Sequence, residues 1–114
     1  MKAALYLRYT TKAEANQFFL SDIDKLEAYA ATHGYELYAS YIETCSGKKP
    51  VVERPTLSRL LKDITNKRCD VVITTDYSRL STNVADLLEM LSVIRSCNTT
   101  LLTIYSTKEI EDEY

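Results

Sequence analysis

Short apolar segments alternate with segments of helical spacing from one end of the chain to the other. Residues 3–9, 35–42, 70–75 and 99–105 are rich in β-branched, aromatic and aliphatic side chains, which predicts four strands. The stretches between them keep apolar residues at helical intervals and predict three helices. Strands joined by helices pair in parallel through right-handed crossovers. The order therefore predicts an α/β fold: a doubly wound, mostly parallel sheet with helices on both faces, in three layers.

The sequence also indicates where the helices begin and end. Ser21 is a possible N-cap of the first helix, and Gly34 ends this helix. Pro55 suits the first turn of the second helix. The faces expected to cover the sheet are apolar side chains at helical spacing: Ile23, Leu26 and Ala30; Leu57, Leu60, Leu61 and Ile64; and Leu87, Leu88, Leu91 and Ile94.

The composition fits one globular domain. The chain has 114 residues, of which 46% are hydrophobic, and this supports a modest core but not a second domain. We expect residues 1–105 to form the domain and residues 106–114 to form a tail. No apolar run suits a membrane span or a secretory signal, so we expect a cytoplasmic protein without a membrane partner. Cys45, Cys69 and Cys97 are far apart and are expected to be free thiols.

The overall charge does not indicate a nucleic-acid binder, because the formal net charge is only -2. Its distribution is less even, since basic residues crowd residues 48–68 and acidic residues crowd the end of the chain. A solvated helix face is the simpler interpretation of the basic segment. Lys48, Lys49 and Arg59 are nevertheless candidates for contacts with phosphate or DNA.

Polar residues follow the predicted strands. In open α/β sheets ligands bind outside the carboxyl ends of the strands, so the loops after residues 9, 42, 75 and 105 are expected to share one edge. These loops contain the polar residues of interest: Thr10 and Thr11, residues 46–54, and residues 76–83. This edge is therefore the expected place for a functional site.

Arg8 lies inside a strand that is otherwise apolar. A buried arginine cannot lose its proton, so it needs a carboxylate or a bound anion as partner. Arg8, Arg54 and Arg79 reach the same edge from three segments, and the planar guanidinium pairs well with phosphate oxygens. These three arginines predict a phosphate receptor. For Arg8, an internal ion pair with Asp76 or Glu53 is an equally weighted alternative.

Several other chemistries do not fit the sequence. The loop after Cys45 lacks the arginine that a cysteine phosphatase requires. His33 stands before Gly34 at a helix end, where it is expected to act as a cap-region residue and not in a catalytic triad. Gly34 and Gly47 are the two glycines of the chain, too few for a dinucleotide or P-loop site. A phosphoacceptor receiver would need acidic residues after the first strand, where Thr10 and Thr11 stand.

Four stretches in consistent order resemble motifs of one known family. They are "YLRYTT", "LEAYAATHGYE", "SGKKPVVERPTLSRLLKDI" and "DVVITTDYSRLSTN". They are similar to the N-terminal catalytic domain of serine site-specific recombinases, which include resolvases, invertases and large serine integrases. The resemblance implies a resolvase-like, flavodoxin-like fold. It also implies DNA strand cleavage and exchange through a covalent link between a hydroxyl and a phosphodiester. No metal or cofactor is implied.

The resemblance assigns candidate roles to individual residues. Arg8, Arg54 and Arg79 match three arginines of the family motifs, and Thr10 stands at the position of the serine nucleophile. The other matched positions depart from the common family residue: Ser78 replaces an aspartate, Thr82 replaces an arginine, and Asp22 stands near a usual glutamine. Such an active site is degenerate. By two-residue alternation, Thr11 should point away from the face shared by Arg8 and Thr10, so Thr11 is no substitute nucleophile.

The departures affect the expected function. A β-branched threonine restricts in-line attack, and loss of an active-site arginine weakens stabilisation of the transferred phosphoryl group, so we expect impaired catalysis. The alternative is a non-catalytic module for protein interaction or weak phosphate binding. In the family, the partners are DNA and further copies of the protein in dimers or tetramers. The resemblance also makes residues 106–114 a candidate start of a truncated dimerisation helix.

Overall fold

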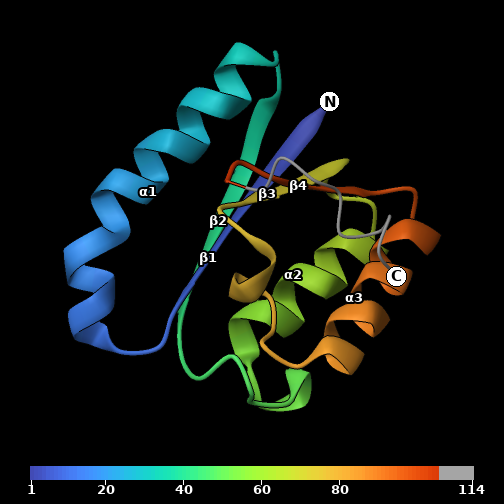
Figure 1. Cartoon of the computed structure of the whole chain (residues 1–114). Helices are drawn as coiled ribbons and strands as arrows, with labels where there is room; N and C mark the ends of the chain where they lie inside the picture. The colour runs from blue at the N-terminus through green and yellow to red at the C-terminus, as the bar shows by residue number, and fades with distance from the viewer. Residues whose placement is uncertain (106–114) are drawn as a thin grey trace.

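The computed structural model describes residues 1–105, and the predictions of a tail or of a helix start at residues 106–114 lie outside the described residues. Helices and strands alternate, as Figure 1 shows. The elements are β1 (Lys2–Tyr9), α1 (Lys12–Thr32), β2 (Glu36–Thr44), the 3-10 turn η1 (Val51–Glu53), α2 (Pro55–Thr65), β3 (Val71–Thr74), the 3-10 turn η2 (Tyr77–Arg79), α3 (Val84–Ser96) and β4 (Thr100–Thr103).

The four strands form one sheet in the order β2-β1-β3-β4, and every neighbouring pair is parallel. Helix α1 packs on one face, whereas α2 and α3 pack on the other (Figure 1). The predicted three-layer, doubly wound fold is therefore confirmed. No helix within residues 1–105 combines the length and the apolar character that crossing a membrane requires.

Strand β1 lies between β2 and β3 and supplies both cores. Leu5 and Leu7 pack with Leu26 of α1 on one face. Tyr6 points to the other face, where it joins Leu57 of α2 and the buried residues of α3. Because successive side chains of a strand alternate between the two faces, all seven residues from position 3 to position 9 are buried. Arg8 therefore shares the face of Tyr6.

Helix α1 begins at Lys12, and the prediction that it begins behind Ser21 was wrong. Thr11 is the N-cap, and its Oγ1 accepts a hydrogen bond from the Glu14 amide at 3.2 Å. Thr11 and Glu14 thus form the Thr-x-x-Glu pattern of a capping box. Ala15 and Phe19 extend the apolar face of α1 by two more turns, and both pack against the core between α1 and the sheet. Ser21 is an exposed residue inside the helix.

The predicted apolar faces of the other two helices need small corrections. In α3, Leu88 was predicted to be buried but is 39% exposed. Met90, which was not predicted, is buried with Leu87, Leu91 and Ile94. In α2, Leu57, Leu60 and Ile64 are buried, but Leu61 is only partly buried at the edge of the core. The buried face of α2 is therefore narrower than predicted, and that of α3 includes Met90 in place of Leu88. The free thiols predicted for all three cysteines are confirmed.

Candidate active site

The loops that follow β1, β2 and β3 meet at the carboxyl edge of the sheet, as predicted. Arg8 lies beside Glu43 in the register of β1 and β2. The loop after β2 then turns past Gly47, whose carbonyl accepts a hydrogen bond from the Thr82 amide at 3.2 Å. The turn η2 follows β3 and places the carbonyl of Arg79 next to the Arg8 side chain. Three separate segments thus surround Arg8.

Arg8 is buried, and neutral oxygen atoms accept its hydrogen bonds. Nε donates to the Arg79 carbonyl at 3.1 Å, and Nη2 donates to the Ser78 carbonyl at 3.0 Å. Nη1 donates to the Cys45 carbonyl at 2.9 Å and to Thr10 Oγ1 at 3.2 Å. Burial, followed by the nearby Arg54 guanidinium, lowers the pKa of Arg8 below its usual value. Arg8 therefore holds three loops together and keeps a positive charge beside the Thr10 hydroxyl.

The ion pair suggested for Arg8 does not form. Asp76 instead accepts hydrogen bonds from the amide and the hydroxyl of Ser78, and so caps the turn η2. The side chain of Glu53 is exposed. Within the described residues, carbonyl dipoles and not a carboxylate thus balance the positive charge of Arg8.

Gly47 packs directly against Arg8. A Cβ atom at this position would lie 3.0 Å from Arg8 Cζ, 3.0 Å from Arg8 Nη2 and 3.0 Å from Thr82 Cγ2. The guanidinium cannot easily move aside, because four hydrogen bonds fix it. The backbone of Gly47 therefore forms one wall of the arginine site.

Gly47→Ala is expected to displace Arg8 and to lower the free energy of unfolding by about 1–3 kcal/mol through overpacking. Urea unfolding gives the stability, and the NMR signal of the Arg8 Nε–H group reports its displacement. Gly34→Ala is the matched control, because a Cβ at Gly34 meets no atom within 4 Å and the cost comes only from its φ of +73°. An unchanged Arg8 signal in Gly47→Ala would contradict the prediction.

Arg54 has 0% relative exposure and is paired with Glu43. Its Nε donates to Glu43 Oε1 at 3.1 Å, and one Nη2 hydrogen bond goes to the Tyr6 hydroxyl at 2.7 Å. The remaining bonds go to the carbonyls of Leu80 and Arg79. Burial opposes the charged form of Arg54, but Tyr6 and Glu43 more than offset this and raise its pKa above the usual value. Arg54 therefore has an internal counter-charge, unlike Arg8.

Glu43 connects this pair to the start of α2. Oε1 also accepts from the Tyr6 hydroxyl at 2.7 Å, while Oε2 accepts from the amides of Thr56 at 3.1 Å and Leu57 at 3.3 Å. Although burial opposes ionisation, these donors and Arg54 lower the pKa of Glu43 below its usual value. The Glu43 carboxylate also caps the N-terminus of α2, because Arg54 at the N-cap position makes no side-chain capping bond.

Glu43 was not among the predicted site residues, because the predicted second strand ended at residue 42. The strand continues to Thr44, so Tyr41 and Glu43 alternate inward together. Glu43 follows Tyr41 by two residues, so the alternation of a strand puts both on one face, and this spacing was a usable signal. With it, the sequence would have paired Glu43 with one of the predicted arginines.

Arg79 is the most accessible of the three arginines, with 21% of its side chain exposed. Its Nη1 donates to the Arg8 carbonyl at 2.9 Å and to Glu14 Oε1 at 3.4 Å, and its Nε donates to Thr75 Oγ1 at 3.3 Å. The guanidinium also lies over the ring of Tyr9, 5.2 Å from its centroid. These contacts orient Arg79 at the mouth of the site.

The residues at the remaining matched positions are arranged around the arginines in different ways. Thr10 and Ser78 are exposed, and Thr82 is exposed beside Gly47. Asp22 is buried on the α1 side of the sheet, where its carboxylate accepts a hydrogen bond from the Tyr9 hydroxyl at 2.6 Å. Within residues 1–105, Asp22 is therefore linked to the site through Tyr9, whose ring lies beneath Arg79.

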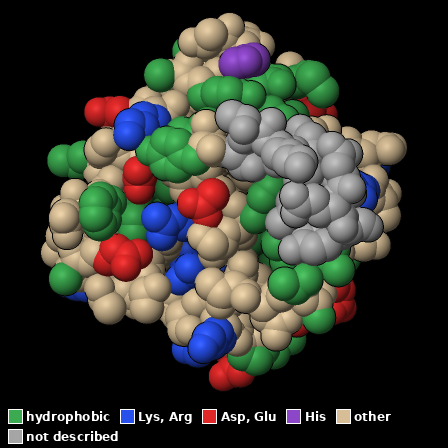
Figure 2. Space-filling view, in the orientation of Figure 1, with side chains coloured by type: hydrophobic (Ala, Val, Ile, Leu, Met, Phe, Trp, Pro, Cys, Tyr) green, Lys and Arg blue, Asp and Glu red, His purple; other side chains and the backbone are tan. Residues whose placement is uncertain are grey.

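The candidate phosphate contacts are less closely grouped. Lys48 and Lys49 are exposed on the loop that includes Gly47. Arg59 instead lies over the ring of Tyr41, 5.4 Å from its centroid, on the outer part of α2. Figure 2 shows acidic and basic side chains interleaved on the surface in view, which is not a uniformly basic face.

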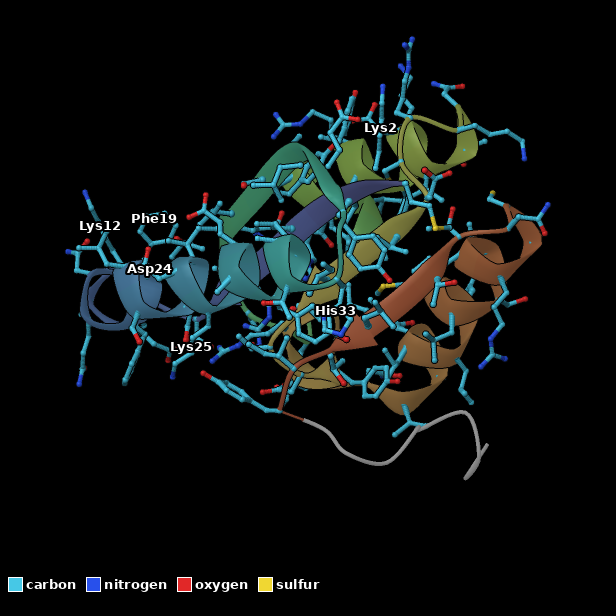
Figure 3. All side chains as sticks on the ribbon, turned by 90° about the horizontal axis from the view of Figure 1, so that it is seen from above. Lys2, Lys12, Phe19, Asp24, Lys25 and His33 are labelled. Carbon is cyan, nitrogen blue, oxygen red and sulfur yellow. The ribbon has the colours of Figure 1, made fainter. Side chains whose placement is uncertain are left out.

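His33 lies at the opposite end of α1 from the site. It is the C-cap residue of the helix, as predicted, and its ring stacks on Tyr29 with centroids 4.0 Å apart. Figure 3 shows His33 at one end of α1 and Lys12 at the other. The arginine site lies near the N-terminal end of α1, beside Thr10. His33 is therefore separated from the site by the length of the helix.

An α/β domain with clustered arginines and an exposed hydroxyl at the carboxyl edge of its parallel sheet is suited to phosphate chemistry. The family model for the resolvase N-terminal domain matches residues 3–113. The chain therefore belongs to the resolvase N-terminal domain family. A comparison with curated proteins finds no match.

Solved structures agree with this assignment. The N-terminal catalytic domain of TP901-1 integrase is 33% identical, with a TM-score of 0.81 over 90% of this chain and 77% of that chain. The catalytic domain of ISC1926 TnpA, an IS607-like serine recombinase, is 20% identical, with a TM-score of 0.85 over 99% and 77%. A resolvase family site-specific recombinase from Streptococcus pneumoniae is 20% identical, with a TM-score of 0.80 over 99% and 81%. The chain has the fold of serine recombinase catalytic domains.

Proposed function

We propose that this chain acts on DNA as the catalytic domain of a serine site-specific recombinase with an impaired active site. The observation that carries the proposal is the contact between Arg8 Nη1 and Thr10 Oγ1, at 3.2 Å. The hydroxyl of the proposed nucleophile thus lies beside a guanidinium that has no carboxylate partner within residues 1–105. The exposed Thr10 and the partly exposed Arg79 stand at the same edge, where a phosphodiester can approach.

The reaction is a phosphoryl transfer. Thr10 Oγ1 attacks the phosphorus, a bond between this oxygen and phosphorus forms, and the bond from phosphorus to the 3′ oxygen of the DNA breaks. The hydroxyl proton leaves Thr10, and the departing 3′ oxygen gains a proton. Arg8 and Arg79 stabilise the charge on the phosphate oxygens, because catalysis of this class depends on positioning and electrostatics.

The three arginines have different roles in this proposal. Arg8 contacts the attacking hydroxyl, and Arg79 contacts the phosphate. Arg54 is fully buried and engaged with Glu43, so it acts as a positioning residue that holds the carbonyls of Arg79 and Leu80. Arg54 thereby fixes the backbone of the turn that presents Arg79.

The partners in this proposal are the DNA backbone and further copies of the protein. Lys48 and Lys49 are exposed on the loop beside Gly47 and are placed to contact neighbouring phosphates. Arg59, which packs over Tyr41, is assigned no phosphate contact. Strand exchange requires two DNA sites held by several subunits, so the proposal includes self-association.

Thr10→Ser tests the catalytic role. The assay uses a chimaera in which this chain replaces the N-terminal catalytic domain of TP901-1 integrase, and it measures covalent protein–DNA complexes on denaturing gels. Thr10→Ser is expected to raise the yield by about tenfold to a hundredfold, because it removes the methyl group that hinders in-line attack. Thr11→Ser is the matched control, since serine caps a helix as well as threonine. Equal yields from the two folded variants would instead favour a non-catalytic module.

A further inference from the structure

Glu14 places a carboxylate at the proposed phosphate site. Its Oε1 accepts hydrogen bonds from the Thr10 backbone amide at 3.4 Å and from Arg79 Nη1 at 3.4 Å. Both donors lie beside the position where the phosphodiester would bind. A single carboxylate oxygen thus receives the same type of donors that a phosphate oxygen would receive.

Capping of α1 explains only part of this arrangement. In a capping box, the glutamate of the first turn reaches back to the amide of the N-cap residue. Here it reaches one residue further, from Glu14 past Thr11 to Thr10, and it also contacts Arg79 from a different loop. The Glu14 side chain is 34% exposed, so solvent and an incoming anion can reach it.

The Glu14 carboxylate can leave Arg79 without leaving the guanidinium unsupported. Within residues 1–105, the other groups that hold the Arg79 guanidinium are neutral: the Thr75 hydroxyl, the Arg8 carbonyl and the Tyr9 ring. These neutral groups can hold the guanidinium in place after the carboxylate leaves. The buried pair of Arg54 and Glu43 is the opposite case, since Arg54 has no exposed surface.

We propose that the Glu14 carboxylate occupies the place of a non-bridging phosphate oxygen and is displaced when a DNA phosphodiester binds to Arg79. Glu14 is then a positioning residue that presets Arg79 and weakens the binding of phosphate to the free protein. This inference rests on the proposed function, because it assumes that the site receives a phosphodiester.

The test is a titration of the ¹⁵N-labelled chain with inorganic phosphate, followed by NMR at the Thr10 amide and the Arg79 Nε–H group. Glu14→Gln keeps an acceptor oxygen but removes the charge, and it is expected to bind phosphate about fivefold more tightly, the range of a partly exposed ion pair. Glu14→Ala serves as a second variant and is expected to show the same gain. Glu27→Gln changes an exposed carboxylate on the same helix and is expected to bind as the unaltered chain does.

The outcomes separate this inference from the function on which it rests. Tighter phosphate binding by both Glu14 variants, each shown to be folded by circular dichroism, would support the displacement. Equal affinity in Glu14→Gln, Glu27→Gln and the unaltered chain, with binding lost in Arg79→Ala, would overturn the role of Glu14 and leave the phosphate site standing. If phosphate shifts neither signal in any variant, the inference and the phosphate site both fail.

Discussion

Glu43→Ala is expected to lower the free energy of unfolding by about 3–5 kcal/mol, because removal of one partner of a buried ion pair leaves the other charge uncompensated. Arg54 has 0% relative exposure and would keep its charge in the core. The amides of Thr56 and Leu57 at the start of α2 would lose their acceptor at the same time. The change therefore removes an ion pair and a helix cap together.

Urea unfolding followed by circular dichroism measures this loss. Glu36→Ala is the matched control, because Glu36 is an exposed residue of the same strand. Glu43→Gln keeps oxygen acceptors without the charge, so we expect a loss between those of the two alanine variants. A loss for Glu43→Ala no larger than the loss for Glu36→Ala would show that the network of Glu43 contributes little to stability.

Arg79→Ala is expected to reduce DNA cleavage about a thousandfold when it is introduced into the Thr10→Ser chimaera, by analogy with arginines that stabilise phosphoryl transfer elsewhere. The expected effect on stability is small, because Arg79 is partly exposed and its ion-pair partner Glu14 is partly exposed as well. The measurement is the rate of covalent complex formation under single-turnover conditions. The same variant is expected to lose phosphate binding.

Arg59→Ala supplies the control for the loss of one positive charge. Arg59 packs over Tyr41 on α2, apart from the arginine site, so its removal is expected to leave cleavage nearly unchanged. If Arg59→Ala and Arg79→Ala slow cleavage equally, the effect comes from overall charge and not from a specific phosphate contact. Such a result would remove Arg79 from the proposed mechanism.

The fold was predictable because alternating apolar and helical segments leave few ways to bury both faces of a parallel sheet. The same reasoning predicted that Arg8, Arg54 and Arg79 would reach one edge, since that conclusion needs only strand direction. It could not predict which groups these arginines contact. Arg8 is held by backbone carbonyls, and the position of a carbonyl depends on loop conformations that have no residue pattern of their own.

Two carboxylates were missed for separate reasons. Glu43 lay one residue beyond the predicted end of its strand, and a small boundary error moved it from the core into a loop. Glu14 lay before the predicted start of the first helix, so the Thr-x-x-Glu pattern that it forms with Thr11 was not recognised. Both errors concern the ends of elements, where local signals are weakest and tertiary contacts decide the outcome.

The carbonyl oxygen of Arg79 accepts hydrogen bonds from Arg8 Nε at 3.1 Å and from Arg54 Nη2 at 3.4 Å. One peptide group therefore accepts hydrogen bonds from two arginines that come from distant parts of the chain. A substitution at either arginine changes the hydrogen bonding of this carbonyl and so the surroundings of the other arginine. The effects of the two substitutions on the free energy of unfolding are therefore not independent. A double-mutant cycle at Arg8 and Arg54 is therefore expected to show a coupling energy that is carried by this shared carbonyl.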